Sequence, residues 1–239
     1  MDKLESFQKN LGIVFKNKDL LRQVFVHRSY LNENPHFDLD HNERLEFLGD
    51  AVLELIVTEH LYKNYKEAEG ILTAWRSALV KGEKLAELAK KFEIGENLML
   101  SRGEDRSGGR TNQLLLANAF EALVGAMYLD QGYETCRDFI EKNLLSHLEE
   151  IIEKKLHVDP KSNLQEKSQE EVGITPTYEV LDEVGPDHAK TFEVGVYLNS
   201  TQLGKGKGSS KQSAQTAAAK DALAKWNKEK ITDKFKNKH

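Results

Sequence analysis

The chain has 239 residues, of which 39% are hydrophobic and 31% charged, and its formal net charge is −5. A typical domain has about 100 to 200 residues, so this length favours two domains. The N-terminus lacks the apolar core of a signal peptide, and the longest apolar run is shorter than the roughly 20 residues of a membrane span. A single cysteine, Cys136, excludes a disulfide framework and a cysteine-based zinc site. We expect a cytoplasmic protein without a membrane partner.

Apolar residues recur at helical spacing from residue 1 to about 156, which predicts an all-helical domain. The clearest runs are DLLRQVFVHRSYL, AVLELIVTEHLYKNY, LTAWRSALVKGEKLAELAKKF, QLLLANAFEALVGAMYLDQGY and CRDFIEKNLLSHLEEIIEKKL. Gly82 lies inside the third run. Residues 101–113, SRGEDRSGGRTNQ, form the one long glycine-rich polar segment, and we expect a loop there.

The pattern changes near residue 157. Asp159 suits a helix N-cap and Pro160 the first helical position, so a helix is expected to run to about Val172. The segments TYEVLDEV, KTFEVGVYLN and TQLGKGKGSS read as three strands, and SKQSAQTAAAKDALAKW reads as a final helix. The predicted architecture is an α-β-β-β-α domain over residues 160–228, after a helical domain over 1–156 and a linker at 157–160. Residues 229–239 are expected to form a basic tail.

Charge is distributed unevenly along the chain. From His188 onward there are 11 basic and 4 acidic residues. Such a stretch is typical of polyanion binding, although a lysine-rich solubilising tail gives the same count.

Four carboxylates lie in the segment HNERLEFLGDAVLEL, residues 41–55, which otherwise has the apolar spacing of a core helix. On a helix, Glu43, Asp50 and Glu54 fall within about 80° of Glu46. Like charges at i, i+4 repel, so this acidic face needs solvent, arginine partners or a divalent cation. All three explanations remain open from spacing alone.

A second acidic element lies in the run LLLANAFEALVGAMYLD, where Asn118 and Glu121 share a face. A lone carboxylate in so apolar a helix is costly unless it is paired or coordinated. Facing the first helix, these residues would complete an all-oxygen cluster suited to Mg²⁺ or Mn²⁺. A di-iron carboxylate bundle is disfavoured, because its Glu-x-x-His spacing occurs only at Glu33 and His36, with Pro35 between them.

The segment ERLEFLGDAVLEL closely resembles the signature of ribonuclease III. The resemblance extends through FVHRSYLNE, EGILTAWRSALV, GEDRSGGR and FEALVGAMYLDQGY, and the C-terminal part is similar to a double-stranded RNA-binding domain. It covers nearly the whole chain. The implied fold is the all-α ribonuclease III endonuclease fold followed by an α+β double-stranded RNA-binding domain.

The resemblance also implies roles for residues. The implied ligands of catalytic Mg²⁺, for which Mn²⁺ substitutes, are Glu46, Asp50, Asn118 and Glu121, and the catalytic residues among them are Asp50 and Glu121. Glu43 and Glu69 match positions of the wider acidic cleft, and Phe47 matches an apolar residue of the homodimer interface. The family usually has Asp where this chain has Asn118. An amide oxygen brings no charge, so we expect retained activity with weaker Mg²⁺ affinity.

Double-stranded RNA-binding domains contact two minor grooves and the major-groove phosphates between them. Gln165 and Gln169 share a helix face at i, i+4, as donors and acceptors for one minor groove. His188 and Lys190 lie in the hairpin loop expected to reach the next minor groove. Lys211 and Lys220 are expected at phosphates, near a helix N-terminus that also favours anions. Gln212 stands where the family commonly has a second lysine, which removes one phosphate contact if it faces RNA.

The sequence therefore predicts a Mg²⁺-dependent endoribonuclease that cleaves double-stranded RNA to 5′-phosphate and 3′-hydroxyl ends. A homodimer would cut both strands and leave short 3′ overhangs. The family suggests substrates among ribosomal RNA precursors and structured messenger RNA. The alternatives are a double-stranded RNA-binding protein with a relic nuclease domain, favoured only by Asn118, and a helical scaffold that binds no RNA.

Overall fold

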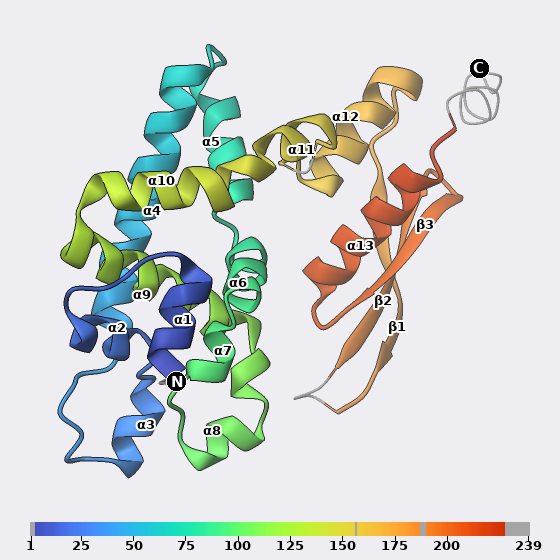
Figure 1. The fold of residues 1–239 in the computed structure, drawn as a ribbon. Helices are drawn as coiled ribbons and strands as arrows, with labels where there is room; N and C mark the ends of the chain where they lie inside the picture. Colours follow the sequence, from blue (N-terminus) through green and yellow to red (C-terminus); the bar gives the residue numbers. More distant parts are fainter. Residues whose placement is uncertain (1–2, 156, 187–189, 228–239) are drawn as a thin grey trace. The chain divides into compact units, whose positions relative to one another are not determined.

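The structure is a computed structural model that describes residues 3–155, 157–186 and 190–227. The chain divides into two compact units, Met1–His157 and Val158–His239 (Figure 1). The predicted tail at 229–239 lies outside the described residues.

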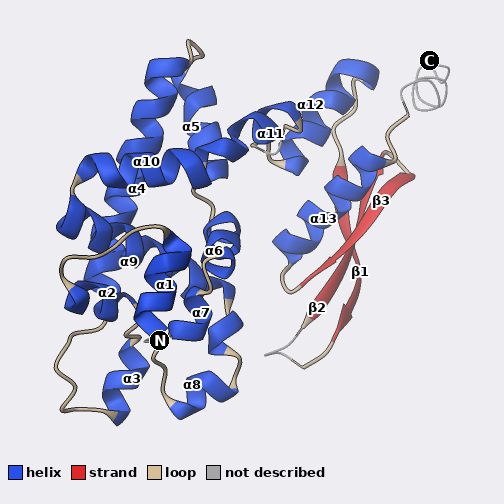
Figure 2. Cartoon of the chain, in the orientation of Figure 1, coloured by secondary structure: helices blue, strands red, loops and turns tan. Residues whose placement is uncertain are grey.

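The first unit is helical, as predicted, and its described residues add only one isolated β-bridge, between Val26 and Met99 (Figure 2). Its helices are α1 Lys3–Leu11, α2 Lys18–Val24, α3 Arg28–Glu33, α4 Glu43–Asn64, α5 Glu69–Leu79, α6 Gly82–Lys91, α7 Ile94–Asn97, α8 Arg102–Arg106, η1 Gly109–Thr111, α9 Gln113–Gln131, α10 Tyr133–Asn143, η2 Leu145–His147 and α11 Leu148–Glu153.

The structure corrects two details of the helical pattern. Gly82 does not lie in the interior of one long helix: α5 ends at Leu79, Lys81 has an extended backbone, and Gly82 is the first residue of α6. The polar segment 101–113 is not one loop but holds α8 and η1. The Ser101 hydroxyl accepts the backbone N–H of Glu104, at 3.2 Å, and this cap lets a short helix form within a glycine-rich sequence.

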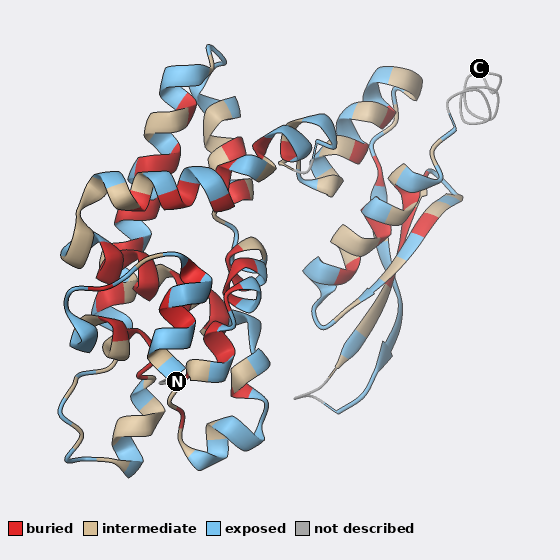
Figure 3. Ribbon diagram, viewed as in Figure 1, coloured by how far each residue is buried: buried red, intermediate tan, exposed pale blue. Residues whose placement is uncertain are grey.

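Helices α4 and α9 pack together at the centre of the first unit. Helix α9 has ten buried residues, from Leu116 to Met127, which appear red in Figure 3. Glycines allow the close approach: a β-carbon at Gly49 would lie 1.8 Å from the Glu121 carbonyl oxygen, and one at Gly125 would lie 2.2 Å from that of Leu45. The backbones of the two acidic segments therefore touch.

The second unit has the predicted α-β-β-β-α order. Its elements are α12 Pro160–Val172, β1 Thr177–Val184, β2 Thr191–Leu198, β3 Thr201–Gly208 and α13 Lys211–Ala224. The antiparallel sheet has the order β1-β2-β3, with Val180 opposite Val194 and Val194 opposite Gly206. As predicted, the Asp159 carboxylate caps α12. A small core of Leu164, Val194, Val196 and four alanines of α13 joins the helices to the sheet.

Candidate active site

The first turns of α4 and the middle of α9 bring together Glu46, Asp50, Asn118 and Glu121. Burial raises the pKa of Glu46, the charges of Glu43 and Asp50 raise it further, and a hydrogen bond from Asn118 opposes them. The pKa of Glu121 rises to about 7, first through burial and then through the charges of Asp50 and Glu46. The carboxylates therefore repel one another across the contact between α4 and α9.

No described cation compensates the inner part of this acidic face. Glu43 lies 3.6 Å from the Arg28 guanidinium and 3.7 Å from the His41 ring. By contrast, Glu46, Asp50 and Glu121 form no ion pair within the described part of the chain. Three uncompensated carboxylates at one place disfavour folding in water unless protons or cations bind to them.

The donor chemistry of this set fits a hard divalent cation, because all of its donors are oxygen atoms. Asn118 contributes an amide oxygen, and its side chain lies close enough to Glu46 to lower the pKa of that carboxyl. Across the described ranges, however, no three Asp, Glu, His or Cys side chains already surround one point in the manner of a metal centre. Cation binding by this set therefore requires side chains to turn toward a common centre.

A small cavity of about 40 Å³ adjoins the Glu46–Asn118 contact. Leu98, Leu100 and Leu115 supply its apolar wall, and His27 also faces it. Burial lowers the pKa of His27, so its neutral ring does not balance the carboxylates near neutral pH. Leu98 and Leu100 lie in residues 98–112, the segment that connects α7 to α9.

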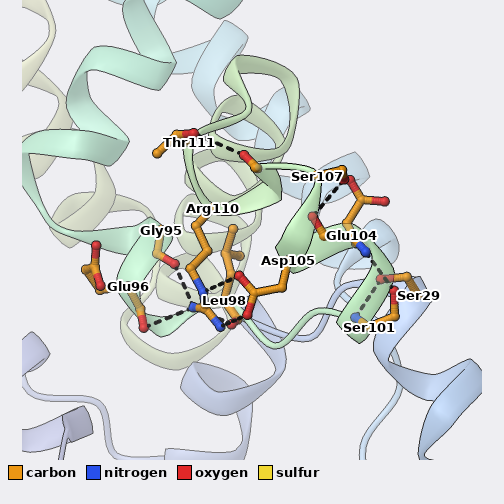
Figure 4. A network of polar contacts seen from close by, with 11 residues as sticks. Ser29, Gly95, Glu96, Leu98, Ser101, Glu104, Asp105, Ser107, Arg110 and Thr111 are labelled. Atoms are coloured by element: carbon orange, nitrogen blue, oxygen red, sulfur yellow. Dashed lines mark hydrogen bonds and ion pairs between the residues drawn. The ribbon is translucent and has the colours of Figure 1, made fainter.

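Arg110 fastens that segment (Figure 4). Its guanidinium donates to both carboxylate oxygens of Asp105, at 2.8 and 3.1 Å, and to the carbonyl oxygens of Gly95 and Leu98, at 3.1 and 3.0 Å. Nearby, the Ser101 N–H donates to the Ser29 hydroxyl at 3.0 Å, which ties α8 to the start of α3. Arg110 therefore holds the wall residue Leu98 close to the beginning of α9.

Sequence reasoning missed the roles of Arg110 and Gly49. The partners of Arg110 are mainly backbone carbonyls, which no residue pattern reveals. Gly49 did carry a signal, because a glycine inside a strongly periodic helix often marks a close backbone approach.

Other predicted residues lie apart from this group. Glu69, at the start of α5, lines a cavity with Tyr62 and Arg76 near the far end of α4, roughly 20 Å along the helix from Glu46. Within a single chain, Glu69 therefore lies away from the acidic face. Glu54 is exposed, and the Phe47 side chain is 82% exposed, so it contributes little to the core of its own chain.

In the second unit, Gln165 and Gln169 are exposed on α12, each next in sequence to a buried residue, Leu164 or Ser168. The Gln169 amide donates to the Thr175 hydroxyl at 3.1 Å. His188 lies outside the described residues.

The predicted lysines do not all share one surface. Lys211 is exposed at the first position of α13. Lys220 is also exposed, but nine residues further on it lies about 180° around the helix from Lys211. One flat RNA surface cannot therefore contact both lysines in the same way. A basic residue that sequence reasoning did not single out, Lys161, donates to the Gln215 amide oxygen at 2.7 Å.

The fold agrees with comparisons to known proteins. A model of Ribonuclease-III-like proteins matches residues 17–148, and a model of the double-stranded RNA binding motif matches residues 160–225. Ribonuclease 3 of Chloroflexus aurantiacus is 44% identical over 234 residues, or 97% of this chain and 95% of that protein. Ribonuclease 3 of Desulforamulus reducens is 47% identical over 214 residues, or 89% of this chain and 87% of that protein.

Solved structures give the same result for the first unit. The nuclease domain of ribonuclease III from Campylobacter jejuni, in a 2.2 Å crystal structure, is 34% identical, with a TM-score of 0.55 over 62% of this chain and 97% of that one. A second structure of that domain, described for flexibility in a region involved in dimer formation, is 37% identical, with a TM-score of 0.54 over 60% and 99%.

Together these findings define an endonuclease joined to a double-stranded RNA-binding domain. The chain belongs to the ribonuclease III family. It is an endoribonuclease for double-stranded RNA, and neither the relic-nuclease alternative nor the scaffold alternative is favoured. Enzymes of this family generally depend on a divalent metal ion. In the described ranges, no helix has the length and apolar character that crossing a membrane requires.

Proposed function

We propose that Glu46, Asp50, Asn118 and Glu121 hold Mg²⁺, with Mn²⁺ as a substitute, and that double-stranded RNA is cleaved there. One observation carries this proposal. The pKa values of Glu46 and Glu121 are both raised, that of Glu121 to about 7, by burial and by neighbouring carboxylates that have no cationic partner among the described residues. Bound Mg²⁺ supplies an activated water and stabilises charge on the leaving oxygen of a phosphodiester. The expected products carry 5′-phosphate and 3′-hydroxyl ends.

The four residues have different tasks in this proposal. The resemblance implies Asp50 and Glu121 as the catalytic pair; the Asp50 side chain is exposed and that of Glu121 is half-buried. Asn118 favours the ionised form of Glu46 and so opposes part of the rise in its pKa that burial and Glu43 cause. Glu43, held by Arg28, adds negative charge at the rim.

RNA recognition is assigned to the second unit. Gln165 and Gln169 would face one minor groove, His188 and Lys190 of the hairpin loop would reach the next minor groove, and Lys211 and Lys220 would contact phosphates. The opposite placement of Lys211 and Lys220 around α13 favours Lys211 as the main phosphate contact of this helix. We propose the predicted domain limits, 1–156 and 160–228, as the functional division of the chain.

Assembly and location complete the proposal. The exposed Phe47 ring would be covered in a homodimer, which allows two sites to cut the two strands. Phe47 matches an apolar position of the family's subunit interface, and its exposure leaves the ring able to contact a second chain. We propose a cytoplasmic location, with ribosomal RNA precursors and structured messenger RNA as substrates.

The experiment is incubation of purified protein with labelled duplex RNA and Mg²⁺, beside the variant Glu121→Gln. Wild type should cut the duplex, and the variant should bind it without cutting. Cleavage by both proteins would refute the assignment of catalysis to this site, and duplex binding without cleavage by either would refute the nuclease activity itself.

A further inference from the structure

Glu183, near the end of β1, lies between two lysines that are proposed to contact RNA. Its carboxylate oxygens are 3.2 Å from the Lys211 Nζ and 3.7 Å from the Lys190 Nζ. The Lys211 ammonium also lies over the Phe192 ring, 5.6 Å from its centroid. The β1–β2 hairpin and the first residue of α13 are thus linked through one acidic side chain.

The two lysine ammonium groups make the surroundings of this carboxylate favourable for an anion. Lys211 opens α13, a helix of 14 residues, whose N-terminus carries a partial positive charge. Ser210 caps the helix by accepting the Ser213 N–H at 3.1 Å, and the earlier N–H groups remain available to an anion. The Glu183 side chain is 36% exposed and that of Lys211 is 59% exposed, so a phosphate can reach the pair from solvent.

We propose that Glu183 is a specificity-determining residue that acts as an internal substitute for an RNA phosphate. In the free protein its carboxylate neutralises Lys211 and Lys190, and a duplex phosphate displaces it on binding. This proposal rests on the proposed function, in which both lysines contact RNA. Glu183 therefore weakens binding of any polyanion that cannot place a phosphate close to both lysines, and it reduces the number of small ions released on binding.

The same domain contains a matched control. Glu193 of β2 lies 3.1 Å from the Lys205 Nζ and 3.2 Å from the Lys207 Nζ, so it also joins two lysines. On β3, Gly204, Gly206 and Gly208 face α13, where an added β-carbon would meet helix atoms. Because side chains alternate along a strand, Lys205 and Lys207 lie on the opposite face of the sheet.

The test uses the full-length protein with labelled duplex RNA in EDTA, where cleavage is prevented, at several salt concentrations. Glu183→Gln should bind the duplex about threefold to tenfold more tightly at low salt, the effect expected of two exposed ion pairs. Its affinity should also fall more steeply with salt, by about one unit of slope. Glu193→Gln should match wild type in both respects. Unchanged or weaker binding by Glu183→Gln would overturn the proposal.

Lys211→Gln separates this inference from the proposed function. If Lys211→Gln weakens binding and most of the gain from Glu183→Gln disappears in the double variant, both stand. If Lys211→Gln weakens binding but Glu183→Gln gives no gain, the pair is an ordinary surface ion pair and only this inference fails. If Lys211→Gln binds as wild type does, Lys211 is not an RNA contact, and the proposed RNA surface fails together with this inference.

Discussion

Gly49 of α4 lies directly against the backbone of Glu121 in α9, and a β-carbon at position 49 would be 1.8 Å from the Glu121 carbonyl oxygen. Gly49→Ala should therefore force the helices apart and lower the free energy of unfolding by about 3 kcal/mol, the cost of overpacking a tight core. Urea denaturation measures the change. Gly70→Ala is the control, because nothing lies within 4 Å of its added β-carbon. Equal stability of the two variants would show that this helix contact is looser than described.

Asn118 sets the charge of the proposed metal site. Asn118→Asp adds a fourth carboxylate to Glu46, Asp50 and Glu121, so the Mg²⁺ concentration for half-maximal cleavage should fall by about tenfold. Without metal the same variant should be less stable than wild type, because the Asn118 side chain, which lowers the pKa of Glu46, is replaced by a carboxylate that repels it. A titration of cleavage rate with Mg²⁺ measures the first effect. An unchanged Mg²⁺ dependence would contradict the account of this substitution.

The stability of the metal-free protein should depend on the ionisation of Glu121. Its pKa is raised from 4.5 to about 7 by burial and by Asp50, so the folded state holds the proton more tightly than the unfolded state does. The stabilisation from this proton is complete below about pH 4.5 and is lost as the pH rises through about 7.

Comparison with Glu121→Gln isolates this dependence. As the pH rises from about 4.5 to about 7 in EDTA, the free energy of unfolding of wild type should fall relative to that of the variant. A constant difference would show that Glu121 is not buried beside other charges. Added Mg²⁺ above pH 7 should restore stability to wild type and not to the variant.

Arg110 should matter for cleavage although it lies outside the acidic group. Arg110→Gln removes the paired hydrogen bonds to Asp105 and those to the Gly95 and Leu98 carbonyls, at a cost of about 2 kcal/mol. Residues 98–112 should then exchange amide hydrogens faster, and cleavage should need more Mg²⁺. The control is Arg106→Gln, which changes an exposed arginine of the same segment. Similar hydrogen exchange in both variants would count against a positioning role for Arg110.

The sequence predicted the fold well because its signals were local. Helical spacing, the Asp159–Pro160 helix start and the β-branched strand segments each act within a few residues. Residues 101–113 were predicted less well, because α8 depends on one serine cap and on the long-range contacts of Arg110.

Prediction of the site divides in a similar way. Helix periodicity put Glu46 and Asp50 on one face, but only the fold shows that Glu121 reaches them through a glycine contact. The fold also shows that Glu69 lies away from the acidic face of its own chain. It further shows Glu183 between two lysines that belong to separate elements. Long-range pairings of this kind leave no periodic signal in a single sequence.

The most direct test of the central claim is a crystal of the protein soaked in Mn²⁺ and measured for anomalous scattering. A peak within coordination distance of the Asp50 and Glu121 carboxylates, with Glu46 and the Asn118 amide oxygen around it, is the predicted result. A peak only at other acidic residues, or none at a Mn²⁺ concentration that supports cleavage, would contradict the claim that these four residues hold the catalytic cation.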